Sequence, residues 1–130
     1  MDQGRPSSAP AEISFRLSWP PSVNHSFRSA TNRRFVHNSK ARQWRLDAAT
    51  EAMIQRVPRE RLMGSLSIEI LAIPPDRRVR DLDNLLKPTL DALTAAGIIA
   101  DDRFVDEIRI RRGRPDAPGR LVVTIRQKGA

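Results

Sequence analysis

The sequence contains no cysteine, and this absence removes several classes of protein. Without a thiol there is no disulfide framework, no cysteine nucleophile and no cysteine-ligated zinc site. No apolar run of about 18 residues occurs, so the sequence predicts no membrane-spanning helix. The first residues, MDQGRPSSAPA, are polar and lack the apolar core of a secretory signal. We therefore expect a soluble cytoplasmic protein that does not bind a membrane.

What the sequence has in excess is positive charge. Its 130 residues include 23 Lys and Arg against 15 Asp and Glu. This net charge of +8 favours a polyanionic partner, meaning nucleic acid or an anionic membrane surface, and of these two we expect DNA. The segment 76–107, however, holds eight acidic and five basic residues, a net charge of −3, and the rest of the chain holds +11. Because DNA repels carboxylates, clustered acids on a DNA-binding protein indicate a bound divalent cation. The alternative is that these acids only cap helices and pair with nearby arginines.

Hydrophobic periodicity predicts the secondary structure. Four stretches alternate apolar with polar residues and are predicted to be strands: 13–19, 66–72, 105–110 and 121–125. Helical spacing predicts one helix that Ser39 caps and that ends before Pro58. It predicts a second helix that starts close to Asp83 or Asn84 and stops at Gly97.

These elements occur in the order β-α-β-α-β-β, which predicts an α+β fold with a small mixed four-stranded sheet packed with two helices. Residues 1–11 are rich in Pro, Ser and Gly and are predicted to be a disordered tail, which leaves one domain over 12–128. The Gly- and Pro-rich segment GRPDAPG is predicted to join the last two strands as a hairpin.

The most informative string is RDLDNLLKPTLD, which holds two aspartates, Asp81 and Asp83, two residues apart. In a mid-helix position these side chains would point in different directions, so a shared cation requires both at the helix start. Lys87 and Asp91 follow Asp83 at steps of four on the polar face of the helix. For Asp91 an exposed ion pair with Lys87 explains the spacing as well as a functional role does. For Asp81 and Asp83 the alternative is helix capping, which uses one aspartate readily but hardly two.

A third carboxylate is available in the loop that follows the helix. The helix from Asp83 to Gly97 is roughly 20 Å long, and the stretch from Gly97 to Asp102 spans about 17 Å when extended. We therefore expect the loop to run back along the helix and to bring Asp102 near Asp83. A loop that turns away and leaves Asp102 more than about 10 Å from Asp81 would contradict this expectation, because metal ligands must converge.

Three converging carboxylates beside a lysine suit phosphodiester hydrolysis. Mg²⁺ binds a few carboxylates together with water and phosphate oxygens, and it can activate water and stabilise a leaving oxygen. Lys87 would stabilise negative charge that develops on the phosphate.

The string RDLDNLLKPTLDALTAAGIIADDRFV, together with WPPSVNHSFR after the first strand, resembles the signature of the RusA family of Holliday junction resolvases. The resemblance extends from about Glu12 to Gln127. It implies a Mg²⁺-dependent endonuclease, with Mn²⁺ as a substitute and no organic cofactor, that acts as a homodimer and nicks four-way DNA junctions symmetrically. By position Asp81, Asp83 and Asp102 match the catalytic acidic residues of the family, and Lys87 matches its essential lysine. Asn84, Asp101 and Asp91 also lie in the motif, with Asn84 suited to orient a ligating carboxylate. Pro88, directly after the lysine, departs from the pattern.

Basic residues cluster in two places outside this motif. The loop after the first strand combines arginines with Phe27 and Phe35, whose rings could either stack on unpaired bases or pack against the sheet. A second group directly precedes the acids. We expect DNA contacts, mostly to phosphate, from both groups: Asn24, Arg28, Arg33, Arg34, Arg77, Arg78 and Arg80.

Two other functions are compatible with the sequence. One is a catalytically silent module that binds junctions or other DNA, in which the acids are structural. The other is a nuclease of the same fold that acts on flaps or other branched DNA.

Overall fold

The computed structural model describes residues 12–21, 30–59 and 62–128, and for residues 30–38 it describes the backbone alone. In chain order the elements are β1 (Glu12–Ser18), α1 (Ala30–Ile54), β2 (Leu66–Ile73), the 3-10 turn η2 (Leu82–Leu85), α2 (Leu86–Ala95), the 3-10 turn η3 (Asp102–Phe104), β3 (Val105–Arg112) and β4 (Arg120–Gln127). The predicted order β-α-β-α-β-β and the α+β class are confirmed. The predicted tail at 1–11 lies outside the described residues.

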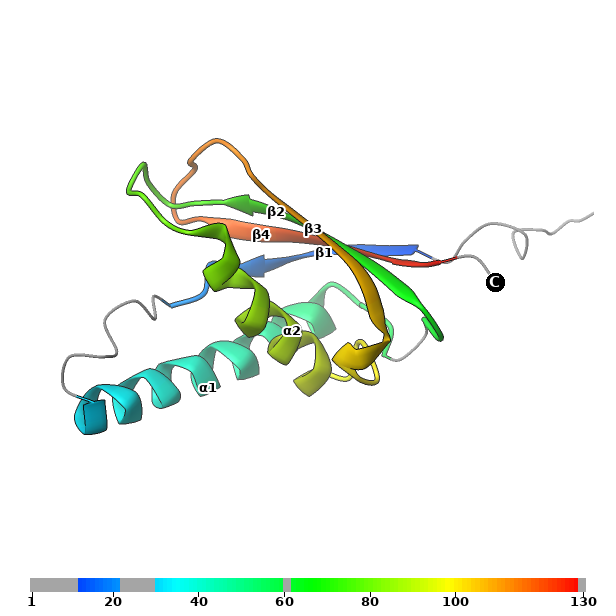
Figure 1. Ribbon diagram of the computed structural model, residues 1–130, viewed down its shortest axis with the longest axis horizontal. Coiled ribbons are helices and arrows are strands. Elements are labelled where there is room, and N and C mark those ends of the chain that lie inside the picture. The colour runs from blue at the N-terminus through cyan, green and yellow to red at the C-terminus, as the bar shows by residue number, and fades with distance from the viewer. Residues whose placement is uncertain (1–11, 22–29, 60–61, 129–130) are drawn as a thin grey trace, which may run out of the picture.

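The four strands form one sheet in the order β1-β4-β2-β3. β4 pairs antiparallel with both β1 and β2, whereas β2 and β3 are parallel, so the predicted mixed sheet is confirmed. The predicted hairpin is wrong, because β4 does not pair with β3 but lies between β1 and β2 (Figure 1). The side chains explain this order. β4 buries Leu121, Val123 and Ile125 completely, as a central strand does, while β3 carries mostly charged, exposed residues that suit an edge.

Both helices cover the same face of the sheet (Figure 1). The core lies between these two layers and is formed by apolar side chains of all four strands and both helices, among them Phe15, Trp44, Ala48, Ile68, Ile70, Leu93, Val123 and Ile125. On the other face of the sheet the cross-strand pairs include polar side chains, apart from Leu71 opposite Val122. Ser14 Oγ lies 3.1 Å from Thr124 Oγ1, and Arg126 pairs with Glu12 at 2.8 Å. Only one face is therefore apolar, as expected for two layers around one core.

The helix boundaries agree with the sequence at three of four ends. α1 stops at Ile54, before Pro58, but it begins at Ala30, so the prediction that Ser39 caps it is wrong. Ser and Asn disfavour a helix by only about 0.5 kcal/mol each, so a helix anchored further on by Trp44 extends through them. α2 ends at Ala95, and the predicted stop at Gly97 lies just beyond it. Gly97 has a φ of +75°, its N–H bonds Thr94 O, and the N–H of Ile98 bonds Leu93 O.

Two loops meet beyond the carboxyl end of β2. Residues 74–81 leave β2 at Pro74, and residues 113–119 join β3 to β4. Backbone bonds of 2.7 Å from Gly113 N to Ala72 O and of 2.8 Å from Asp116 N to Pro74 O hold them together. Gly119 (φ +88°) is buried against Pro75, where a Cβ would lie 2.8 Å from the proline Cδ. None of the helices in the described ranges is long and apolar enough to span a membrane.

Candidate active site

Asp81 and Asp83 lie at the start of the second helical segment, as predicted. Asp81 has extended backbone (φ −83°, ψ 129°) and directly precedes η2, which holds Asp83. The chain turns here because Asn84 N donates to Asp81 O at 3.3 Å, and α2 continues from the same turn. Pro88 is the third residue of α2, where its missing N–H leaves no helical hydrogen bond unmade. The side chain of Asp81 therefore does not cap the helix start, which forms through backbone hydrogen bonds.

The carboxylates of Asp81 and Asp83 are exposed to solvent. Asp81 and Asp83 make no side-chain hydrogen bond or ion pair within the described part of the chain. The capping alternative is therefore not what the structure shows for Asp81. Since neither carboxylate has a partner among the described residues, their oxygens are available to an external cation or proton donor.

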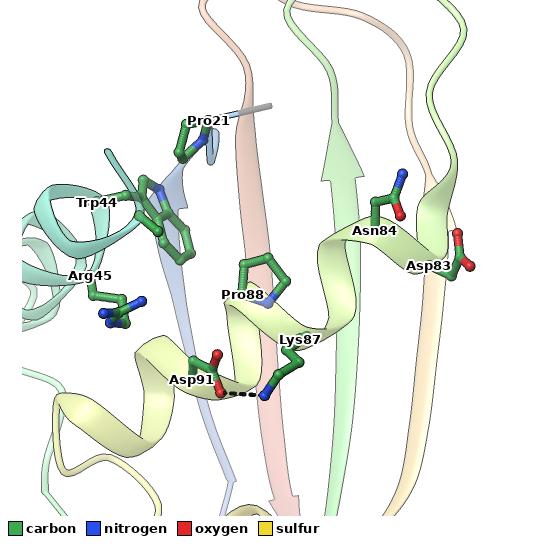
Figure 2. A pocket seen from close by; sticks show the side chains of 9 residues that line it. Pro21, Trp44, Arg45, Asp83, Asn84, Lys87, Pro88 and Asp91 are labelled. Atoms are coloured by element: carbon green, nitrogen blue, oxygen red, sulfur yellow. Dashed lines mark hydrogen bonds and ion pairs between the residues drawn. The ribbon is translucent and has the colours of Figure 1, made fainter. Parts of the chain in front are cut away.

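Lys87 lies one helical turn after Asp83. Its Nζ pairs with Asp91 Oδ1 at 3.3 Å, with the lysine side chain 83% exposed and that of Asp91 38% exposed (Figure 2). An exposed i,i+4 pair of this kind contributes about 0.3 to 0.5 kcal/mol, so it holds the ammonium only loosely. Asp91 thus forms the ion pair that its spacing allows, and Lys87 can leave that pair at little cost.

A groove of about 340 Å³ separates α1 from α2 beside these residues. Its lining comes from α1, η2, α2 and the segment that follows β1: Pro21, Ala41, Trp44, Arg45, Asp83, Asn84, Lys87, Pro88 and Asp91. Figure 2 shows Trp44 on the α1 side, Pro88 on the α2 side and Pro21 above them. The four motif residues Asp83, Asn84, Lys87 and Asp91 thus share one concave surface.

Asp101 and Asp102 lie at the opposite end of α2. The parallel pairing sets Val105 beside Leu66, at the start of β2, whereas Asp81 follows the end of β2. η2 and α2 together separate the two ends by roughly 20 Å. The expectation that the loop brings Asp102 back to Asp83 is therefore wrong within one chain, because the loop turns directly into β3. Nowhere in the described ranges do three or more acidic or histidine side chains gather as a metal cluster.

The two aspartates of this loop differ from one another. Asp101 Oδ1 accepts a hydrogen bond of 2.9 Å from Arg103 N and caps η3. This bond, together with one to the Asp102 side chain, holds the pKa of the Asp101 carboxyl below its usual value. Asp102 is exposed in the first turn of η3. Asp101 therefore serves the local turn, and Asp102 presents its carboxylate to solvent.

The arginines before the acidic motif fall into two kinds. Arg77 and Arg78 are exposed, with 78% of the Arg78 side chain accessible. Arg80 is only 22% exposed, because its guanidinium pairs with Asp76 at 2.8 Å and lies 5.7 Å from the ring centre of Trp19. The hydrogen bond from Arg80, with a further one from Arg78 N, lowers the pKa of Asp76. Arg80 thus anchors the loop, while Arg77 and Arg78 face solvent.

A residue of the sheet that the sequence patterns did not single out fixes this loop by a hydrogen bond. Arg112, the last residue of β3, donates from Nη2 to the backbone carbonyl of Arg80 at 2.6 Å. The signal was present in the alternation of β3. Ile108 and Ile110 face the helices, and Arg112 continues the same face with a charge where an apolar side chain is expected.

Several predicted DNA contacts cannot be placed. Asn24, Arg28 and Phe27 lie outside the described residues. Arg33, Arg34 and Phe35 fall within α1, where the backbone alone is described, so they belong to a helix and not to the predicted loop.

The available oxygens fit a hard divalent cation. Mg²⁺ takes one or two carboxylates and completes its shell with water and phosphate oxygens. Asp81 and Asp83 offer two carboxylates at one end of α2, exposed and without a side-chain partner in the described ranges. The donor set on this chain therefore matches such an ion, and Asp102 of the same chain lies too far away to join it.

Comparison with known proteins finds close relatives. The family model described as endodeoxyribonuclease RusA matches residues 18–126. A crossover junction endodeoxyribonuclease of Enterobacteria phage HK97 is 36% identical over 115 residues, 88% of this chain and 93% of that protein. Proteins with the same name from Shigella sonnei and Escherichia coli K12 are 39% and 38% identical over 116 residues, 89% of this chain and 95% of each relative.

Proposed function

Because the chain belongs to the RusA endodeoxyribonuclease family, we propose that it is a structure-specific endonuclease that resolves four-way (Holliday) DNA junctions by paired, symmetric nicks in recombination and repair. One observation carries this proposal beyond the likeness itself. Asp81 and Asp83 lie at one helix start with exposed carboxylates, and Lys87 follows one turn later. A groove that opens beside them offers the DNA a concave surface. The protein would act in the cytoplasm, and it would bind neither a membrane nor an organic cofactor.

Asp81 and Asp83 would hold Mg²⁺, for which Mn²⁺ is a chemical substitute. The ion, when bound, supplies a nucleophilic water at neutral pH and stabilises the leaving oxygen. The residues of this chain position the DNA strand: Lys87 places a positive charge beside the scissile phosphate, and its loose pair with Asp91 lets it move there. Asn84, which lines the groove directly after Asp83, would orient that carboxylate.

Asp102 enters this proposal only through a second copy of the chain. The length of α2 separates it from Asp81 and Asp83 within one chain. In a homodimer whose two α2 helices run antiparallel, each Asp102 comes close to the Asp81 and Asp83 of the other copy. A four-way junction needs two symmetric cuts, which a two-fold dimer with two such sites would make. Asp101, as the cap of η3, would hold Asp102 in place.

The basic residues would bind the phosphates on either side of the site. Arg77 and Arg78 are exposed in the loop that leads to Asp81, and this position supports a contact with the DNA backbone. Arg80 would contribute by anchoring that loop and not by direct contact, because Asp76 and Trp19 already engage it. Four further residues would add contacts from the segment before and within the start of α1: Asn24, Arg28, Arg33 and Arg34.

Cleavage of defined DNA structures tests the function. The protein is incubated with a labelled four-way junction, a matched duplex and a flap, in Mg²⁺ or in EDTA. We expect paired symmetric nicks on the junction alone and only in Mg²⁺. Binding without cuts would show a silent module instead, and efficient flap cleavage would show a nuclease for other branched DNA. Asp83→Asn should abolish cutting and retain junction binding, since it removes a negative charge that repels DNA.

A mixing experiment tests the shared site. Asp83→Asn and Asp102→Asn proteins are each inactive, but a heterodimer of the two has one site with all three carboxylates if the sites are shared between copies. We expect the mixture, after subunit exchange, to recover single nicks on the junction. If each site were built from one chain, every site in the heterodimer would lack a carboxylate and the mixture would stay inactive.

A further inference from the structure

The groove between α1 and α2 has properties that the cleavage chemistry does not use. Its lining includes Pro21, Ala41, Trp44 and Pro88, four apolar side chains contributed by three separate segments. Trp44 is 5% exposed and is fixed by a hydrogen bond of 3.1 Å from its Nε1 to Ser18 O. A rigid indole forms part of this surface, so the groove is built into the core packing and is not a product of side-chain motion.

The rim of the groove carries charged side chains. Lys87 and Arg45 lie at its edge, with the lysine side chain 83% exposed. Figure 2 shows these two residues on opposite sides, Arg45 from α1 and Lys87 from α2. Two carboxylates, Asp83 and Asp91, line the groove as well, and Asp91 pairs with Lys87 at 3.3 Å. Because Lys87 can leave this exposed pair at little cost, the apolar floor with a cation on either side fits a ligand that has a flat apolar body and flanking negative charges. A nucleobase with its two neighbouring phosphates has that form.

The size and place of the groove restrict the ligand further. A volume of about 340 Å³ is at the small end for ligand pockets, too small for a duplex but sufficient for one base. Asp83 and Lys87 of the candidate active site line the same groove. A base held there would be within a nucleotide or two of the phosphate that is cut.

From these features, and on the basis of the proposed junction cleavage, we propose that the groove receives one unpaired nucleobase of the DNA, adjacent to the cleavage site. The base packs between the pyrrolidine ring of Pro88 and the edge of Trp44, and Lys87 and Arg45 bind the phosphates on either side. Pro88 thereby acquires a role: a proline in the first turn places a rigid apolar ring on the groove wall without cost to the helix. Because α1 lines the groove, α1 contributes to the selection of the phosphate that is cut.

The first test is binding, which does not require cleavage. The chain has two tryptophans, so Trp19→Phe leaves Trp44 as the sole reporter. In EDTA we expect a four-way junction to quench the fluorescence of Trp44 on binding. An unchanged emission spectrum at saturating junction would overturn the proposal. Absence of nicks by the wild-type protein in Mg²⁺ would instead refute the proposed function and leave this result standing.

The second test couples a filled groove to a missing base. Ala41→Phe fills the groove from α1, and Leu46→Phe, at a position 57% exposed and away from the groove, is its matched control. An abasic nucleotide is moved through the positions nearest the branch point. At one position we expect the abasic site to weaken binding by wild type and Leu46→Phe on the order of tenfold. Binding by Ala41→Phe should change less than about twofold there. Equal losses in all three proteins, or no sensitive position, would overturn the proposal.

Discussion

The guanidinium of Arg112 donates a hydrogen bond of 2.6 Å to the carbonyl of Arg80, the residue directly before Asp81. This bond ties the edge strand of the sheet to the loop that carries the acidic motif. Arg80 is fixed in turn by Asp76 and Trp19, so the backbone that enters the motif is held from two sides. The position of Asp81 therefore depends on residues that contact neither metal nor DNA in the proposed mechanism.

Arg112→Ala should slow cleavage by loosening this loop. The lost bond involves a charged donor, and because it is exposed we expect a loss of about 1 kcal/mol, or about fivefold in single-turnover nicking. The matched control is Arg111→Ala, which removes the same charge from the opposite face of β3. Equal effects of the two substitutions on nicking would show that only charge matters and that Arg112 does not position Asp81.

Lys87 and its partner Asp91 should behave very differently on substitution. We expect Lys87→Ala to reduce nicking by about 100-fold or more, since it removes a charge proposed to stabilise the transition state. Asp91→Asn should stay within about threefold and cost about 0.3 to 0.5 kcal/mol of unfolding free energy, as befits an exposed ion pair. Single-turnover rates and urea denaturation give the two quantities. A loss of 100-fold in Asp91→Asn would place that residue in the catalytic machinery.

The stability of the protein in acid should depend on Asp76. Its hydrogen bonds from Arg80 and Arg78 lower its pKa in the folded state below the ordinary 3.8. Its stabilising contribution is then present above the unfolded pKa and is lost as the pH falls through the lowered folded pKa. As the pH falls from neutral through the lowered folded pKa, we expect Asp76→Asn to lose less unfolding free energy than wild type. Asp47→Asn on α1 is the control, and an identical pH profile of Asp76→Asn and wild type would contradict the prediction.

The two loops beyond β2 should tolerate no side chain at Gly119. A Cβ there would lie 2.8 Å from Pro75 Cδ and 3.2 Å from Ile73 O, and the φ of +88° is itself unfavourable for alanine. We expect Gly119→Ala to lower the unfolding free energy by about 2 to 4 kcal/mol. Gly64→Ala has a similar φ of +75° with no atom within 4 Å, so it should cost only about 1 kcal/mol. Equal costs in urea denaturation would show that the contact with Pro75 relaxes freely.

The helices and strands of this fold, and the place of the acidic motif at the start of α2, could be predicted from the sequence. Both depend on residues that are close together in the chain. Strand alternation and the position of Pro88 are such local signals. The pairing of β4 was not predictable in the same way, since it joins residues far apart in the chain, from Ile73 with Arg120 to Leu66 with Gln127. The density of charge on β3 was nevertheless a readable sign of an edge strand, and it argued against a hairpin with the apolar β4.

The prediction that the loop brings Asp102 back to Asp83 was wrong for a related reason. A chain-length calculation shows how far a loop can reach, but the direction of the loop is set by the strand that follows it. Here Val105 joins β2 in parallel, which sends the chain away from Asp81. A helix that connects two parallel strands begins near the carboxyl end of the first strand and ends near the amino end of the second, so its two ends lie at opposite ends of the strands. Recognition of that topology from the sequence would have separated the two acidic groups.

The same crossover gives α2 a further consequence. With acids at both ends of the helix and two copies antiparallel, the two proposed sites of a dimer lie one helix length apart, roughly 20 Å. In such a dimer the number of turns in α2 would decide how far apart the two strand breaks fall.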